Sequence, residues 1–268
     1  METSVTTKKT TIQSVMGSQI VMKKLNDCLG NPKAAASFAS SVVSLTTGNY
    51  MLKDADPWSV VGAAMVAATL GLSIVPSIGE AYIIPYKLHG QTKAQFQLGW
   101  KGLYQLCIRS GQFAYVCAEP VHKGELVSGN RFTGEYQFDE TKKESDEVIG
   151  YMASFRLTNG FAKTVYWNID EVKKHATRFS QSYRRGGDTP WKSDFDAMAC
   201  KTVLKSLLSK YGPKSLDFVD ALRYDQSAVK IEKDNLSGDD IIMEPEYIDY
   251  TQSEAMDNIT KAAEEATE

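Results

Sequence analysis

An apolar helix that runs directly into a strand most constrains how this chain can fold. Residues 60–70 read VVGAAMVAATL, which is apolar nearly all round and rich in small side chains. A helix without a polar face is buried by protein, and small residues let other backbones approach it closely. The next stretch, SIVPSIGEAYIIPY at 73–86, breaks at Pro76 and Gly79 and continues as a strand pattern. We therefore predict a central helix joined to a β-sheet.

The first predicted hairpin follows at once. It joins AYIIPY at 81–86 to AQFQLGW at 94–100 through the polar, glycine-containing tip KLHGQTK. Alternate residues of a strand share a face. In the second arm we expect a buried face of Phe96, Leu98 and Trp100 and a wet face of Gln95 and Gln97.

Further strand patterns complete the predicted sheet. Residues 113–121 (FAYVCAEPV) form one strand, and residues 148–157 and 161–167 form a second hairpin. The Asn159-Gly160 pair between its arms favours a tight turn. The sheet is therefore expected to be mainly antiparallel.

Shorter helices are predicted on both sides of these strands. Helical spacing of apolar residues marks 12–29 and 34–49, and a short helix spans 101–111. On that short helix Lys101, Gln105 and Arg109 recur at every fourth residue, which makes one exposed stripe.

Two helices are expected after the second hairpin. Asn168 and Glu171 have the spacing of a capping box for a helix at 169–179. Ser193 and Asp196 are the predicted caps of a long helix that runs to Tyr211, before Gly212-Pro213. Its expected outward residues are Lys201 and Lys205, and its expected inward residues are Cys200, Leu204, Leu207, Leu208 and Tyr211.

Charge divides the chain unevenly. The overall formal charge is -3, but residues 231–268 contain 12 Asp/Glu and 2 Lys/Arg, which leaves residues 1–230 with 28 Lys/Arg and 21 Asp/Glu. A basic body suits a polyanionic partner, and an acidic tail suits a separate contact or a self-shielding role. The low hydrophobicity of the tail predicts that it is disordered on its own.

Several classes of protein are disfavoured by what the sequence lacks. The 4 cysteines and 3 histidines are scattered, so neither a disulfide framework nor a zinc site is indicated. Neither a G-x-x-x-x-G-K-[ST] loop nor a G-x-G-x-x-G turn occurs, which argues against ATP or dinucleotide binding. The N-terminal residues lack an apolar signal region, and no apolar run is long enough to cross a membrane. We expect a cytoplasmic protein without a cofactor.

The best enzymatic candidate is NIDEVKK at 168–174. Asp170, Glu171 and Lys173 imitate the acidic-x-lysine pattern of metal-dependent nucleases. The same acids suit a helix N-terminus without any catalytic task, because they complement the helix dipole. The capping interpretation is favoured, and a nuclease remains the alternative.

Basic and aromatic residues make a stronger case for nucleic-acid binding. Cationic side chains neutralise phosphates, and aromatic rings stack on bases. No motif that reads base edges is present, so phosphate tracking without sequence preference is expected. The candidate DNA-binding residues are Lys87, Lys93, Gln97, Lys101, Arg109, Arg178, Tyr183, Arg184, Arg185, Trp191, Lys201 and Lys205.

Four stretches in consistent order carry a family resemblance. They are LGLSIVPSIGEAYIIPY at 70–86, FQLGWKGLYQLCIRSGQ at 96–112, VHKGELV at 121–127 and TPWKSDFDAMACKTVLKSLLSKY at 189–211. Together with the acidic tail they resemble the RecT family of phage recombination proteins. The resemblance implies an ATP-independent single-strand annealing protein, rather than an enzyme, that coats single-stranded DNA and pairs it with a complementary strand.

The resemblance also implies a fold and partners. The fold is a compact α+β core related to the Red-beta annealing protein, with a mainly antiparallel sheet, hairpins and packed helices. We expect a helical region with subunit contacts at 1–59, the DNA-binding core at 60–230 and a partner-binding tail at 231–268. The implied partners are single-stranded and annealed duplex DNA, further copies in rings or filaments, a phage exonuclease and the host single-strand-binding protein. An influence of Mg²⁺ on DNA binding stays open, and no protein site for it is predicted. A passive single-strand-binding protein is the other alternative.

Overall fold

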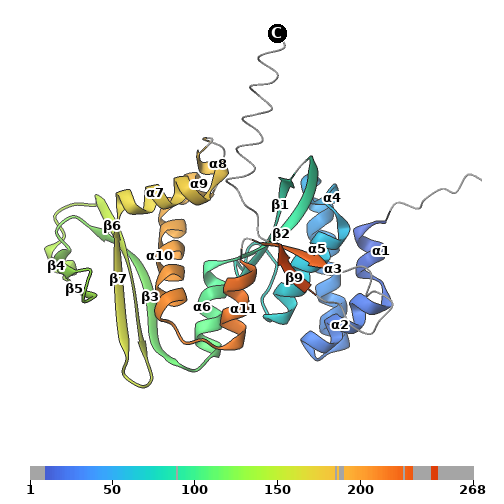
Figure 1. The fold of residues 1–268 in the computed structure, drawn as a ribbon, viewed down its shortest axis with the longest axis horizontal. Helices are drawn as coiled ribbons and strands as arrows, with labels where there is room; N and C mark the ends of the chain where they lie inside the picture. The colour runs from blue at the N-terminus through green and yellow to red at the C-terminus, as the bar shows by residue number, and fades with distance from the viewer. Residues whose placement is uncertain are drawn as a thin grey trace, which may run out of the picture. The chain divides into compact units, whose positions relative to one another are not determined.

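The computed structural model describes residues 10–88, 90–184, 186, 190–225, 227–231 and 243–246 (Figure 1). The described residues divide into two compact units, one of residues 10–102 with the described residues of 220–246, and one of those within 103–219. Each unit combines helices with antiparallel strands, which confirms the α+β class. In the described part of the chain, every helix is too short or too polar to cross a membrane.

The first unit is built on α5 (Pro57–Thr69). Every residue from Ser59 to Ala68 is buried, as the apolar pattern predicts. A Cβ at Gly62 would lie 2.8 Å from the Val229 Cβ, so this glycine permits close packing of helix on strand. Asp56 caps the helix by accepting from the Ser59 amide at 3.0 Å.

The sheet of this unit has the order β1-β2-β8-β9, with every neighbouring pair antiparallel. The strands are β1 (Ala81–Leu88), β2 (Gln91–Leu98), β8 (Ser227–Ile231) and β9 (Met243–Glu246). The hairpin strands are longer than predicted, because pairing continues to Leu88 and Gln91. The outermost of these strands, β1 and β9, contain Pro85 and Pro245, and a proline on an edge strand lacks a donor for further pairing.

Two expectations for β2 were wrong. Gln95 is only 8% exposed, because it lies between Ile84 of β1 and Ala228 of β8. Trp100 does not extend the buried face of Phe96 and Leu98. It starts helix α6 and is 46% exposed.

Helices α1 (Ile12–Met16), α2 (Gln19–Leu29), α3 (Pro32–Gly48) and α4 (Tyr50–Lys53) form the N-terminal part of this unit. The predicted helix at 12–29 is broken at Gly17 and Ser18, because Gly17 ends α1 and Ser18 begins α2. Gly30 ends α2 in the left-handed region, at φ 64°, where glycine is favoured. Asn31 then caps α3, accepting from the Lys33 amide at 2.8 Å.

The second unit is a three-stranded sheet covered on one face by two helices (Figure 1). Its strands, in the order β3-β6-β7, are β3 (Phe113–His122), β6 (Val148–Leu157) and β7 (Ala162–Asn168). The covering helices are α7 (Ile169–Phe179) and α10 (Phe195–Tyr211). Tyr151, Ala153 and Phe155 of β6 are buried.

Several short elements had not been expected from the sequence. They are the hairpin β4 (Leu126–Asn130) and β5 (Glu135–Phe138), the 3-10 turn η1 (Glu140–Lys142), and helices α8 (Gln181–Arg184), α9 (Pro190–Ser193) and α11 (Leu216–Tyr224). In the predicted tail, Met243–Glu246 forms β9 on β8. Ile231 ends β8, and the remainder of 231–268 lies outside the described residues.

The long helix α10 corrects three expectations. Asp194, not Ser193, caps it, accepting from the Ala197 amide at 3.2 Å, because Ser193 already ends α9. Lys201 is 9% exposed, so its predicted outward orientation was wrong. It precedes buried Leu204 and Leu208 by three and seven residues, which is the spacing of one helix face. Tyr211, expected inside, is 43% exposed.

Candidate nucleic-acid interface

Helix α6 (Trp100–Arg109) carries the predicted basic stripe. Lys101, Gln105 and Arg109 are exposed and follow one another at four-residue steps. The opposite face is buried through Leu103, Leu106 and Cys107. The predicted division of this helix into a wet and a buried face is therefore confirmed.

The joint between α5 and β1 holds the start of α6. Glu80 accepts from the Ser73 amide at 2.7 Å with its carboxylate, and its carbonyl accepts from the Gly99 amide at 2.7 Å. A Cβ at Gly99 would lie 2.1 Å from the Gly79 oxygen, and one at Gly102 would lie 2.1 Å from the Glu80 oxygen. Glycine is thus required where α6 crosses the joint. Glu80 is a turn residue here, and its carboxylate is used in the loop.

Three candidates lie on the first hairpin. Lys87 pairs with Thr92 in the strand register, although its side chain is not among the described ones. Lys93 stands opposite Tyr86 and is half-buried, and Gln97 stands opposite Tyr82 and is also half-buried. Together with Lys101, these candidates belong to the first unit.

The end of α7 and the segment after it supply two exposed cations and one buried ring. Arg178 and Arg184 are exposed, and the Arg178 Cζ lies 5.1 Å from the Phe179 ring centroid. Trp191 is only 7% exposed, and its ring lies 5.9 Å from Tyr183 and 5.5 Å from Phe195. Trp191, a candidate for stacking on a base, therefore packs into this aromatic cluster. Arg185 lies outside the described residues.

Arg178 of α7 and a further candidate, Lys205 of α10, lie near one histidine. His175 lies between Trp167 and Phe179, at centroid distances of 5.4 and 4.5 Å. Burial lowers the pKa of His175, and the positive charges of Lys205 and Arg178 lower it further. Lys205 and Arg178, 27 residues apart in sequence, are thus within electrostatic reach of the same ring.

Glu171, one of the acids in the nuclease-like pattern, helps to cap helix α7. The Glu171 carboxylate accepts from the Asn168 amide at 2.9 Å, and the Asn168 side chain accepts from the Glu171 amide at 2.9 Å. This reciprocal pair is the predicted capping box of α7. Within the described ranges, no group of three or more His, Cys, Asp or Glu side chains is arranged to hold a metal ion.

Sequence reasoning missed two cation-aromatic pairs of the second unit. On β3 and β6, the Arg156 Cζ lies 5.2 Å from the Tyr115 ring centroid. At the β4–β5 turn, the Arg131 Cζ lies 5.0 Å from the Phe132 ring centroid. Asn130 and Gly134, which flank that turn, were the available sequence signal for a hairpin.

These features define a class before any relative is considered. Both α+β units present exposed or half-buried cations, and Glu171, one of the acids with nuclease spacing, belongs to a helix cap. Exposed cations of this kind suit a polyanionic partner such as a nucleic acid.

Comparison with known proteins gives the family. Residues 36–237 match the model of the RecT family, and the chain belongs to this family. It is similar to the uncharacterized protein YqaK of Bacillus subtilis (strain 168), with 43% identity over 245 residues that cover 91% of this chain and 82% of YqaK. It is also similar to Protein RecT of Escherichia coli (strain K12), with 27% identity over 186 residues that cover 65% of each chain. Membership supports a role in single-strand DNA annealing and recombination.

Proposed function

We propose that the protein anneals complementary single strands of DNA without ATP, as an oligomeric ring or filament that coats the first strand. The observation that carries this proposal is family membership over 36–237, together with the exposed basic stripe of α6. Neither annealing nor coating requires a catalytic group, since correct pairing and stacking of the bases drive the reaction.

The physical mechanism rests on how the first strand is held. Lysine and arginine neutralise phosphates and release counterions, which binds the backbone without reading the bases. Base edges then stay available for a second strand to test. Lys101 and Arg109 on α6, Arg178 and Arg184 near the end of α7, and Lys205 on α10 are the cations we assign to this task. Contacts between subunits, expected from residues 1–59, make the binding cooperative.

Replacing Arg184 and Arg185 by alanine tests the phosphate contacts. Each lost contact to a single strand reduces the slope of log affinity against log salt by about 0.7, so the double variant should lose roughly 1.4. Fluorescence anisotropy with an oligonucleotide at several salt concentrations measures both affinity and slope. Lys142→Ala with Lys210→Ala is the matched control, because it removes two exposed charges outside both the candidate set and residues 1–59. An unchanged slope in the arginine variant would sink the assignment.

A mixing assay separates the proposal from its rivals. Complementary oligonucleotides are mixed with the protein, without ATP, and the products are separated by electrophoresis while particles are imaged. An annealing protein speeds pairing and leaves strand lengths unchanged, whereas a passive single-strand-binding protein slows pairing. A nuclease would shorten the strands with Mg²⁺ and lose that activity on Glu171→Ala. The engagement of Glu171 in the α7 cap favours annealing.

The acidic tail is assigned to partners. We propose that residues 231–268 recruit a phage exonuclease or the host single-strand-binding protein, while a purely self-shielding tail is the alternative. Such a protein works on phage or prophage DNA in recombination and repair, in the cytoplasm of a bacterial host. Removing 247–268, which keeps strand β9, should preserve annealing by the purified protein and impair recombination in cells. Loss of annealing in vitro would count against the partner role.

A further inference from the structure

The β4–β5 hairpin displays one large aromatic side chain at its tip. Phe132 is 86% exposed, more than any other large apolar side chain among the described residues. Its backbone is nevertheless held, since the Asn130 side chain accepts from the Phe132 amide at 2.9 Å and the Gly134 amide donates to the Asn130 carbonyl at 2.8 Å. Gly134 adopts φ 75°, which closes the turn. The ring is therefore presented by an ordered turn.

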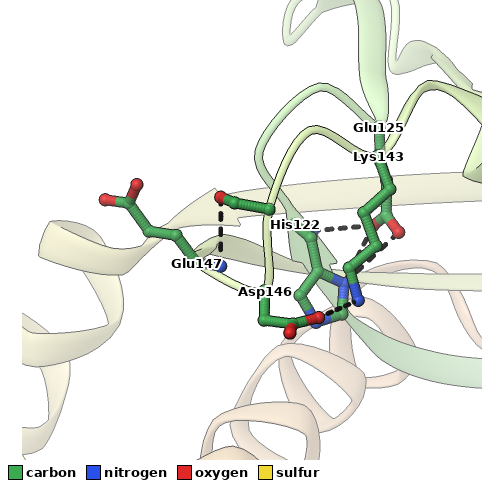
Figure 2. A network of polar contacts seen from close by, with 6 residues as sticks. His122, Glu125, Lys143, Asp146 and Glu147 are labelled. Atoms are coloured by element: carbon green, nitrogen blue, oxygen red, sulfur yellow. Dashed lines mark hydrogen bonds and ion pairs between the residues drawn. The ribbon is translucent and has the colours of Figure 1, made fainter.

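Polar contacts fix the base of the hairpin (Figure 2). Glu125 accepts from the His122 amide at 2.7 Å and lies 3.2 Å from its ring Nδ1. The Glu125 carbonyl accepts from the Asp139 amide at 2.9 Å, which joins the two outer ends of the hairpin. Lys143 and Asp146 form an ion pair at 2.7 Å in the segment that returns to β6. The base is thus tied to the chain on both sides.

A second set of contacts fixes the side of the hairpin. The rings of Tyr136 and Phe138 lie 6.0 and 6.3 Å from that of Tyr166 on β7. The Lys163 Nζ, also from β7, donates to the Thr133 carbonyl at 3.0 Å. In Figure 1 the hairpin stands beside β7, away from α10. Base and side are anchored, and only the tip projects.

The chemistry of the tip fits a nucleotide. The Arg131 guanidinium lies over the Phe132 ring at 5.0 Å, so an aromatic face and a positive charge occur together. Lys163 adds a second positive charge beside the turn. The nearby exposed residues Ser128, Asn130 and Thr133 are polar, and Glu135 places one negative charge beside them, where its carboxylate accepts from the Thr133 hydroxyl at 3.1 Å. A protein interface of ordinary size needs a broader apolar area, whereas a single base needs only one ring.

We propose that this Arg131–Phe132 tip binds one unpaired nucleotide of single-stranded DNA, with Phe132 stacked on the base and Arg131 paired with the phosphate. The inference rests on the proposed annealing function and adds a subsite that discriminates unpaired from paired bases. A base stacked on Phe132 is withdrawn from its neighbours, and pairing with the complement competes with that stack. At this tip an unpaired base is therefore favoured over a paired one.

Binding to normal and abasic strands tests the subsite. Anisotropy is measured with a thymidine oligonucleotide and with a strand of the same length and charge that lacks bases. Since one stacked base contributes about 1–3 kcal/mol, Phe132→Ala should lose about five- to 150-fold affinity for the normal strand and little for the abasic one. Arg131→Ala should reduce the salt slope by about 0.7 for both strands.

Two controls separate this test from general effects. Val127→Ala removes another exposed apolar side chain, 41% exposed, from the same hairpin and should leave both affinities unchanged. Phe132→Trp should restore the preference for the normal strand over the abasic one. The fluorescence of the introduced indole should be quenched when DNA binds. Thermal unfolding of Phe132→Ala should match the parent protein, because the side chain contributes little buried area.

The outcomes are distinct. If Phe132→Ala keeps the full preference for the normal strand while the parent protein anneals, the subsite is overturned and the annealing function stands. If Phe132→Ala changes only the sedimentation of the protein, the tip is a contact between copies and the proposal is wrong. If the parent protein does not bind single strands at all, the proposed function itself fails.

Discussion

The two hairpins β1–β2 and β4–β5 each join two antiparallel strands through a glycine-containing turn, but they differ in what surrounds them. In the first, Ala94, Phe96 and Leu98 of β2 are buried, and β2 is paired on both sides, with β1 and β8. In the second, β4 and β5 pair only with each other among the described strands, and most of β4 is exposed. The first hairpin is scaffold, and the second presents its tip to solvent.

The two hairpins are stabilised by different contacts. A two-stranded hairpin is marginal in water by itself. The β4–β5 hairpin compensates through polar contacts at its base and the Tyr166 ring at its side. The β1–β2 hairpin draws on α5, where the Ser59 hydroxyl accepts from the Ala94 amide at 2.8 Å, and on Asp225, which accepts from the Leu98 amide at 2.8 Å. Predictions that separate the two hairpins follow, from the largest expected effect to the smallest.

Adding one methyl group at each hairpin should have unequal effects. Gly99→Ala brings a Cβ within 2.1 Å of the backbone oxygen of Gly79, which cannot move without disturbing the joint. We expect a loss of about 3 kcal/mol or more in the free energy of unfolding. Gly129→Ala on β4 meets the Tyr136 ring at 2.7 Å, which is half-buried and can tilt, so about 1 kcal/mol is expected.

Urea unfolding of both variants measures this difference. Gly48→Ala is the neutral control, because a Cβ there meets nothing within 4 Å. Equal destabilisation by the two hairpin substitutions would contradict the assignment of β1–β2 as the more tightly enclosed hairpin.

Truncating the tail at two positions should affect the first sheet differently. Removing 232–268 deletes β9 and leaves the edge of β8 open, whereas removing 247–268 keeps the Met243–Glu246 strand. The longer deletion should lower the unfolding free energy by about 1–2 kcal/mol relative to the shorter one, through lost backbone hydrogen bonds. An open edge also favours association between strands of different molecules. Urea unfolding and light scattering check both effects, and identical behaviour of the two truncations would show that β9 adds nothing.

Acid should weaken the polar contacts at the base of the β4–β5 hairpin. The pKa of Glu125 is lowered, first by the hydrogen bond from the His122 amide, and the pKa of Asp146 is lowered by Lys143. A carboxylate with a lowered pKa stabilises the fold above its unfolded pKa, about 4, and this stability is lost as pH falls through the folded value. The urea concentration at the unfolding midpoint should therefore decrease as the pH is lowered below about 4. It should decrease less steeply in Glu125→Gln. The same pH dependence in both proteins would refute a role for Glu125.

Much of the fold could be predicted where local signals are strong. The all-round apolar pattern predicted buried α5, and the Asn168–Glu171 spacing predicted the cap of α7. The stripe of Lys101, Gln105 and Arg109 was found because helical periodicity alone separates the two faces of α6.

Other parts depended on partners distant in sequence. The pairing of β8 with β2 joins Ala228 to Gln95, and no local pattern indicates which strand a five-residue segment will join. Trp191 was named as a candidate for stacking on bases, yet Tyr183 and Phe195 enclose it. Burial of such a side chain is a property of the assembled cluster.

By itself the sequence determined the α+β class, the central helix, the cap of α7, the basic body and the family resemblance. These follow from periodicity, from hydrogen bonds between residues three or four apart, and from charge, all of which are local or additive. Only the tertiary structure decided which hairpin is enclosed, that Lys201 and Trp191 are buried, and that Phe132 is displayed on an anchored turn. These outcomes depend on which surfaces pack together, because burial is set by neighbours that the chain brings from far away.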